Sequence, residues 1–241
     1  MDRRVLIPLA ALALAAPQAA CIDWDSLYAP TGGDADGGDS STTPDAHQDP
    51  MGDDGCSDGE VEVSEDETAE GTDGGIVACA GAWSVPGVIS SEETTCGRAA
   101  GDDGQNLSGE GCSVADLCAV GWHVCRTADE VAAHQGAALC EHVQQEDAAI
   151  YITRQGSTEP DNERCSSEAQ PGSGDDVYGC GTLGLESADC EPLDRRLAIG
   201  MEGDAEGSCP PPFNCGEDSA SEGINITKTG PSGGGVLCCR D

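Results

Sequence analysis

The sequence predicts an α+β domain that is held together by disulfide bonds and follows an acidic linker. The first observation is the cysteine content, 15 in 241 residues. The second is the scarcity of large side chains, because aromatic residues make up only 3% of the chain and glycine reaches 34 residues. A core this poor in bulk needs cross-links to stay folded. The third is one helix-capping pattern set among short apolar runs that are typical of strands.

The first 20 residues have the layout of a secretory signal. Arg3 and Arg4 precede the apolar run 5–16, and small residues follow it. The run is too short to span a bilayer as a stable helix. The next residues, Ala19-Ala20-Cys21, resemble the lipobox of bacterial lipoproteins. That resemblance implies an exported chain with a lipid on Cys21, anchored in a membrane. The alternative is ordinary cleavage of the signal, which would leave Cys21 bridged or free.

The position after Cys21 bears on the destination of the chain. In bacterial lipoproteins an Asp at this position favours retention in the inner membrane, and here it is Ile22. The resemblance therefore implies the outer membrane or the cell surface. The formal net charge of −36 opposes binding to nucleic acid or to anionic lipid, since these partners carry the same sign of charge.

The number of cysteines agrees with a lipid on Cys21. Fifteen is odd, and one lipidated cysteine leaves fourteen that can pair completely in an oxidising compartment. The fourteen expected disulfide cysteines are Cys56, Cys79, Cys96, Cys112, Cys118, Cys125, Cys140, Cys165, Cys180, Cys190, Cys209, Cys215, Cys238 and Cys239.

Residues 21–75 form the lipidated N-terminus and the linker. From Ala29 to Gly75 the chain is almost without apolar side chains and carries 15 acidic residues, a composition typical of a disordered, extended tether. Carboxylates are spaced as in calcium loops in 34–39, and again in 53–55 with Asp58 and Glu60. A complete loop is missing, so a solvated acidic spacer is the favoured interpretation. We expect Cys56 to attach the end of the linker to the domain.

Residues 76–241 form the cysteine-rich domain. The pattern Thr127-Ala128-Asp129-Glu130 is a capping box and predicts a helix over 128–143, with Gly136 as a point of interruption. Adjacent residues of a strand project to opposite sides, so Cys238 and Cys239 should bridge to different partners. We expect most of the aromatic side chains in the core. The predicted strands are 76–78, 122–124, 149–152, 197–199, 224–227 and 236–239.

Two stretches of this domain resemble a known family. The stretch 118–124, CAVGWHV, with the acidic helix start 128–130, is similar to the CPxGWHxPxxxEW opening of bacterial FISUMP domains. The ending 236–241, VLCCRD, resembles their closing VRCVRD strand. The resemblance implies a C-type-lectin-like fold in which the first and last strands pair. It also implies a disulfide from Cys140 on the helix to Cys238 or Cys239.

The segment Glu159-Pro160-Asp161-Asn162-Glu163 is similar to the calcium-binding loop of C-type lectins. The resemblance implies that Glu159, Asp161, Asn162 and Glu163 supply oxygens to Ca²⁺, which would hold sugar hydroxyls. The family's Trp-Asn-Asp motif is absent before the last strand, where Asn225-Ile226-Thr227 stands. A polar turn around the proline is the more economical interpretation, and on it the domain needs no cofactor.

No catalytic motif emerges from the sequence. It contains no Gly-x-Ser-x-Gly elbow, His-Glu-x-x-His helix or phosphate-binding loop. We therefore expect no enzyme, but a cell-surface lipoprotein that presents a binding or structural module, with carbohydrate or an envelope protein as its partner. Two alternatives stay open, a secreted hydrolase without a recognisable motif and a calcium-dependent lectin.

Overall fold

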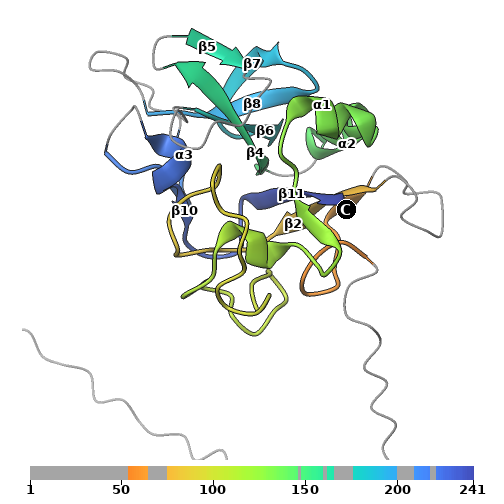
Figure 1. Cartoon of the computed structure of the whole chain (residues 1–241), viewed down its shortest axis with the longest axis vertical. Coiled ribbons are helices and arrows are strands. Elements are labelled where there is room, and N and C mark those ends of the chain that lie inside the picture. The colour runs from red at the N-terminus through yellow and green to blue at the C-terminus, as the bar shows by residue number, and fades with distance from the viewer. Residues whose placement is uncertain are drawn as a thin grey trace, which may run out of the picture. The chain divides into compact units, whose positions relative to one another are not determined.

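The computed structural model describes residues 54–64, 75–145, 148–159, 162–165, 176–199, 209–217 and 221–241. All of them lie in one structural unit, His47–Asp241. The α+β class is confirmed, with strands predominating over helices (Figure 1). No helix in the described ranges combines the length and the apolar character that crossing a bilayer requires.

One mixed sheet organises the unit. Its strands lie side by side in the order β1 (Val63–Ser64), β2 (Ile76–Ala80), β11 (Gly234–Arg240), β4 (Ile150–Glu159), β6 (Val177–Gly181), β8 (Leu193–Leu197) and β7 (Leu185–Cys190). Two more strands join this path, β3 (Trp122–Val124) beside β11 and β5 (Asn162–Cys165) beside β4. A separate small sheet pairs β9 (Phe213–Asn214) with β10 (Thr227–Lys228). The helices are α1 (Ala128–Ala133), α2 (Gly136–Val143), α3 (Glu222–Asn225) and the 3₁₀ helix η2 (Val114–Leu117).

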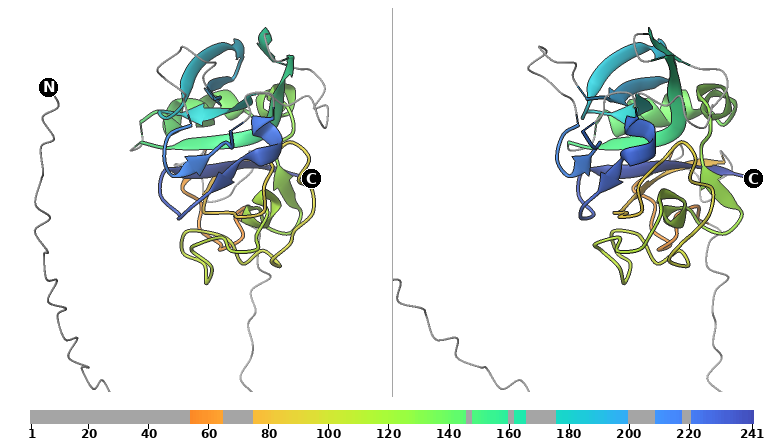
Figure 2. Two further views of the ribbon diagram at one scale, coloured as in Figure 1. Left: turned by 90° about the vertical axis from the view of Figure 1, so that its left-hand side faces the viewer. Right: turned by 60° about the vertical axis from the view of Figure 1, so that its left-hand side comes forward.

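The strands β2 and β11 form the buried centre of the sheet. Both faces of β11 are covered, and its alternate residues belong to two different hydrophobic clusters. Val236 and Cys238 pack with the loops that precede β3, whereas Leu237 and Cys239 pack with α1 and α2. Figures 1 and 2 show these loops on one side of β2 and β11 and the two helices on the other. The aromatic side chains of the described residues are buried as expected, and they are Trp83, Trp122, Tyr151, Tyr178 and Phe213.

Seven disulfides join the fourteen cysteines that follow Cys21. They are Cys56–Cys79, Cys96–Cys112, Cys118–Cys238, Cys125–Cys239, Cys140–Cys180, Cys165–Cys190 and Cys209–Cys215. Most of their sulfurs are enclosed by the two hydrophobic clusters. Cys21 itself lies outside the described residues.

The disulfide expected between Cys140 and the last strand is not formed. The antiparallel register sets β3 directly beside the end of β11, and Cys118 and Cys125 flank β3. These two cysteines therefore take Cys238 and Cys239, one on each face of the strand. Cys140 instead lies on α2 and bonds Cys180 of β6. The prediction that the adjacent pair has different partners is confirmed, and the prediction for Cys140 is wrong.

The helix predicted over 128–143 is two helices. Thr127 caps α1 as expected, because its hydroxyl accepts the amide of Glu130. The break falls at Gln135, whose φ of 61° is left-handed and cannot continue a right-handed helix. A Cβ on Gly136 would lie 2.2 Å from the Cγ1 of Val131, so the tight turn also requires glycine there.

The predicted strands at 76–78, 122–124, 149–152 and 236–239 are confirmed. The other two predictions are wrong in most of their residues, since β8 ends at Leu197 and α3 covers Ile224 and Asn225. The domain also begins before residue 76. Cys56 is bonded to Cys79, and β1 pairs antiparallel with β2, so residues 54–64 of the expected linker belong to the fold.

Candidate functional site

The expected calcium loop includes the end of β4 and the start of β5. Glu159 ends β4, Asn162 begins β5, and the two residues are paired across the antiparallel ladder. Asp161 lies outside the described residues, as do the side chains of Glu159, Asn162 and Glu163. Calcium binding in this loop therefore stays a prediction.

A pocket of about 260 Å³ lies where the β4–β5 hairpin meets the first turn of α1. Its lining comes from the start of α1, from β4 and β5, and from the end of β7: Thr127, Ala128, Asp129, Gln155, Cys165, Asp189, Cys190 and Glu191. The Cys165–Cys190 disulfide joins two of these elements. The side chain of Gln155 is buried, and its Oε1 accepts the amide of Ala128 at 3.0 Å, which holds α1 against β4.

The charge of the pocket restricts what it can bind. Its lining has three exposed carboxylates, on Asp129, Asp189 and Glu191, and contains no Lys, Arg or His. Such a lining disfavours anionic ligands and accommodates neutral or cationic groups.

His123 lies at the centre of a cluster of charged side chains beside α1. Its Nε2 lies 2.9 Å from a carboxylate oxygen of Glu130, and its Nδ1 lies 2.6 Å from one of Asp241. The backbone amide of Arg126 donates to the second oxygen of Glu130. The imidazole therefore connects β3 to α1 and to the residue that follows β11.

The carboxylates change the titration of this cluster. The hydrogen bond with Glu130 raises the pKa of His123 most, and Asp241 adds to it, while partial burial opposes both. For Glu130, burial works to raise the pKa, but the imidazole and the amide of Arg126 together hold it below its usual value. No hydroxyl or thiol nucleophile is among the hydrogen-bond partners described for His123, so this cluster lacks the arrangement of a hydrolase triad.

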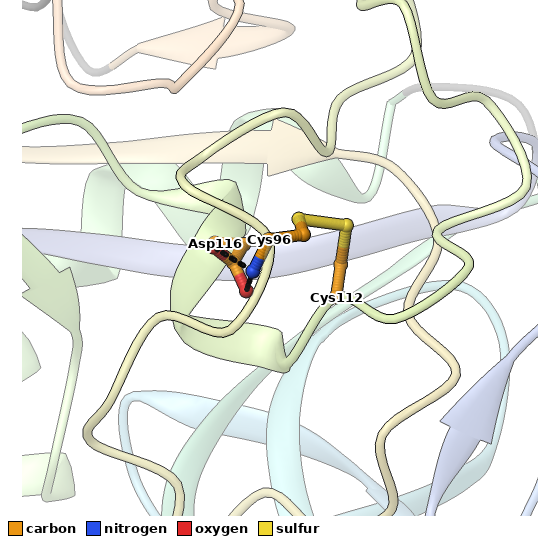
Figure 3. Close-up of side chains that lie close together, drawn as sticks. All are labelled: Cys96, Cys112 and Asp116. Carbon is orange, nitrogen blue, oxygen red and sulfur yellow. Dashed lines mark hydrogen bonds between the residues drawn. A yellow bond between two sulfur atoms is a disulfide. The ribbon is translucent and has the colours of Figure 1, made fainter.

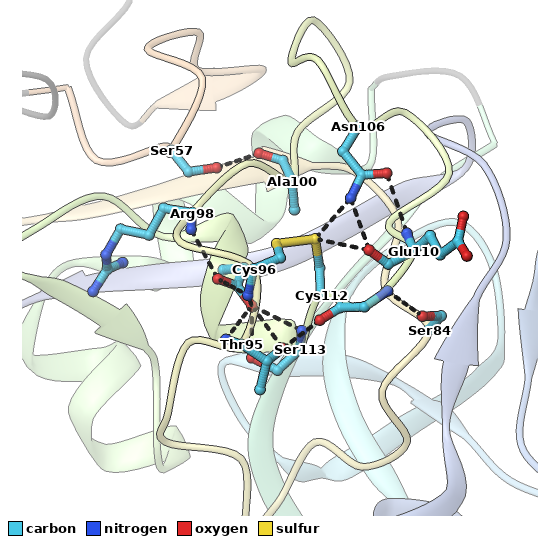
Figure 4. The surroundings of a disulfide bond; sticks show 12 residues. Ser57, Ser84, Thr95, Cys96, Arg98, Ala100, Asn106, Glu110, Cys112 and Ser113 are labelled. Carbon is cyan, nitrogen blue, oxygen red and sulfur yellow. Dashed lines mark hydrogen bonds between the residues drawn. A yellow bond between two sulfur atoms is a disulfide. The ribbon is translucent and has the colours of Figure 1, made fainter.

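Cys96, Cys112 and Asp116 lie close enough together to suggest a metal site (Figure 3). Two observations argue against a metal. The two cysteines form a disulfide and have no thiolate to offer. The carboxylate of Asp116 is fully buried and already accepts the amides of four residues, as Figure 4 illustrates around the disulfide: Thr95, Cys96, Arg98 and Ser113. Asp116 is therefore an anchor for the loop before η2.

The amide donors also explain the ionisation of Asp116. Burial alone would raise its pKa, but the amides of Thr95, Arg98 and Ser113 stabilise the charged form and bring the pKa below the usual value.

A second cluster joins the segment 54–64 to the rest of the unit. Asp58 accepts the amides of Glu60 and Asp103, and Glu62 accepts the amide of Ala80 at 2.7 Å. Burial raises the pKa of Glu62 to about 8. The amide of Ala80 opposes this rise, and a hydrogen bond with Asp102 adds to it. The calcium-like spacing of Asp58 and Glu60 thus lies within a set of neighbouring carboxyl groups, one of which, Glu62, has a strongly raised pKa.

Lys228 is fully buried beneath the same cluster. Its ammonium group donates to the carbonyl oxygens of Gly81, Gly230 and Pro231 at 2.7, 2.9 and 3.0 Å. Burial lowers its pKa to about 7, and the carboxylates of Asp102 and Glu62 oppose that effect. The hydrogen bonds of Lys228 therefore connect the turn before β11 to the residue that follows β2.

Comparison with family models, with curated proteins and with solved structures finds no match to this chain.

Sequence reasoning did not identify His123, Asp116 or Lys228 as partners in these clusters. Only His123 had a usable signal, because it precedes the capping-box Glu130 by seven residues and a short strand followed by a turn can bring the two together. The donors of Asp116 and the carbonyl partners of Lys228 are mostly backbone groups, which leave no pattern in the side-chain sequence.

Proposed function

We propose that this chain is an exported lipoprotein that presents a disulfide-stabilised binding or structural module at the cell surface. The observation that carries the proposal is the complete pairing of the fourteen cysteines from Cys56 to Cys239. Cys21 is then the one cysteine left over, and it follows directly after the signal-like stretch. Disulfides in such number form and persist outside the reducing cytosol.

The finer fold that we propose for the module is C-type-lectin-like. In support, β3 and β11 pair antiparallel, as the first and last strands of that fold do, and the two helices follow β3 directly. The disulfide of Cys140 to Cys180 departs from the pattern that the resemblance implied. The pocket beside the β4–β5 hairpin supports a binding role, because it is a concave surface walled by rigid, cross-linked elements.

Lipidation can be tested on protein from the native host by intact mass and peptide mapping. We expect a diacylglycerol and an amide-linked acyl chain on Cys21, no free thiols, and loss of membrane attachment in Cys21→Ser with the disulfides retained. Recovery of wild-type protein with Cys21 unmodified, or disulfide-linked, would overturn the proposal.

The calcium-dependent lectin is a finer version of the same proposal. Its support is the hairpin that places Glu159 opposite Asn162. Glycan-array binding that EDTA abolishes, and that Asp161→Asn with Glu163→Gln also abolishes, is the expected result. Binding that survives chelation would exclude calcium from the recognition.

A further inference from the structure

We propose that His123 is a proton-dependent clasp that holds Asp241 against β3 while the imidazole is doubly protonated and releases it when the proton on Nδ1 is lost. The inference concerns the folded domain alone and goes beyond the proposed function, since it requires neither lipid nor ligand. An exported domain is exposed to the pH of its surroundings, so such a clasp would respond to the medium.

The geometry requires two protons on the ring. Each imidazole nitrogen lies within hydrogen-bond distance of a carboxylate oxygen, 2.9 Å for Glu130 and 2.6 Å for Asp241. An ionised carboxylate only accepts hydrogen bonds, and a neutral imidazole has one donor and one acceptor nitrogen. In the neutral ring one carboxylate would therefore face a lone pair, and that contact must open.

The carboxylates of Glu130 and Asp241 differ in how firmly they are held beside the His123 ring. Glu130 has a side chain that is 21% exposed, and it is also held by the amide and the guanidinium of Arg126. Asp241 has a side chain that is 61% exposed and can turn into water at little cost. Nε2 therefore keeps its proton for Glu130, and Nδ1 is the nitrogen that titrates.

Other charged groups near the ring are few. Arg126 disfavours the imidazolium, while Glu92, which is paired with Arg154 of β4, favours it at longer range. Arg240 is turned away, because it stacks on the ring of Trp122 on the opposite face of β3. The local balance of charge is negative, and the pKa of His123 is raised accordingly.

Release of Asp241 should loosen the end of β11. Beyond the side chain, Asp241 is held by its amide, which donates to the carbonyl oxygen of Gly121 at 3.0 Å. The raised pKa means that the contribution of the clasp to stability is fully present below the ordinary histidine pKa near 6.5 and is lost as the pH rises through the raised value.

The test is NMR on the oxidised full chain labelled with ¹⁵N. We expect His123 to titrate above the ordinary histidine pKa of 6.5, with its pKa lowered in Asp241→Asn and lowered further in Glu130→Gln. Hydrogen exchange of the Asp241 amide, corrected for its intrinsic pH dependence, should become several-fold faster through the His123 titration. The signal of His123 is assigned with His123→Gln.

Asp241→Asn is the matched control for release. An asparagine amide can donate to a bare Nδ1 or accept from a protonated one, so this variant should keep constant protection across the same pH range. Constant protection in the wild type would overturn the proposal. The proposal would also fail if the Asp241 amide of the wild type and the residue 241 amide of Asp241→Asn lost protection equally. Exchange of this amide would then report the global stability of the domain and not the state of His123.

Discussion

At the residue scale, several ionisable side chains of the domain form hydrogen bonds with backbone amides and carbonyls. Asp116 accepts four amides, Lys228 donates to three carbonyls, and Glu62 accepts the amide of Ala80. In each case a buried or half-buried ionisable group is hydrogen-bonded to main-chain groups, which lowers the penalty of removing it from water. The loops around β2 are therefore ordered by polar contacts as well as by disulfides.

Glu62 allows a test of this account through pH. Its folded pKa of about 8 exceeds the ordinary 4.5, so its contribution to stability is fully present below pH 4.5 and is lost as the pH rises through 8. Glu62→Gln cannot ionise, and its amide can donate to Asp102. We expect the variant to be more stable than the wild type above pH 8 by up to about 5 kcal/mol, since each unit of pKa shift is worth about 1.4 kcal/mol, and the difference to vanish near pH 4.

Urea unfolding of the oxidised chains between pH 4 and 9 measures this difference. Glu141→Gln serves as the control, because Glu141 is an exposed carboxylate on α2. If Glu62→Gln and Glu141→Gln changed the stability alike at every pH, the raised pKa of Glu62 would be refuted.

At the element scale, the break between α1 and α2 carries local strain. Gln135 adopts φ 61°, a left-handed conformation that costs a residue with a Cβ about 1 kcal/mol relative to glycine. Gln135→Gly should therefore stabilise the domain by about 0.5–1 kcal/mol. Gly136→Ala should destabilise it, because the new Cβ would lie 2.8 Å from the carbonyl oxygen of Val131 as well as against its side chain.

Thermal unfolding by circular dichroism distinguishes the two variants by the sign of the change in Tm. Ala133→Gly, two residues earlier at the exposed last position of α1, is the control for a glycine in helical conformation and should lower Tm. A lower Tm for Gln135→Gly would mean that the Gln135 side chain stabilises the domain by more than its left-handed backbone conformation costs.

At the scale of the whole molecule, two disulfides close most of the domain. Cys118–Cys238 and Cys125–Cys239 span 120 and 114 residues, whereas Cys209–Cys215 spans 6. Chain-entropy reasoning assigns about 4–5 kcal/mol to the first of the two long closures and about 2 kcal/mol to the short one. The second long disulfide adds only a short loop, because its cysteines lie beside those of the first. The long pair also fixes β3 to β11 from both faces, and thereby joins the two hydrophobic clusters.

Paired Cys→Ala variants test this ranking. We expect the variant that lacks both Cys118–Cys238 and Cys125–Cys239 to lose more than half of the wild-type urea midpoint, and the variant that lacks Cys209–Cys215 to remain folded with a small shift of the urea midpoint. Equal losses in the two variants would show that loop length does not govern stability here, and that local packing around each sulfur does.

The sequence alone was enough to predict the α+β class, the disulfide bonding of the fourteen cysteines, the opposite directions of Cys238 and Cys239, and four of the strands, because these follow from local pattern and side-chain geometry. The partners of the cysteines, the inclusion of residues 54–64 and the clusters around Asp116 and Lys228 depended on the fold. Each is a contact between segments far apart in the chain or a bond to a main-chain group. Neither leaves a trace in spacing or residue type, so tertiary packing alone decides them.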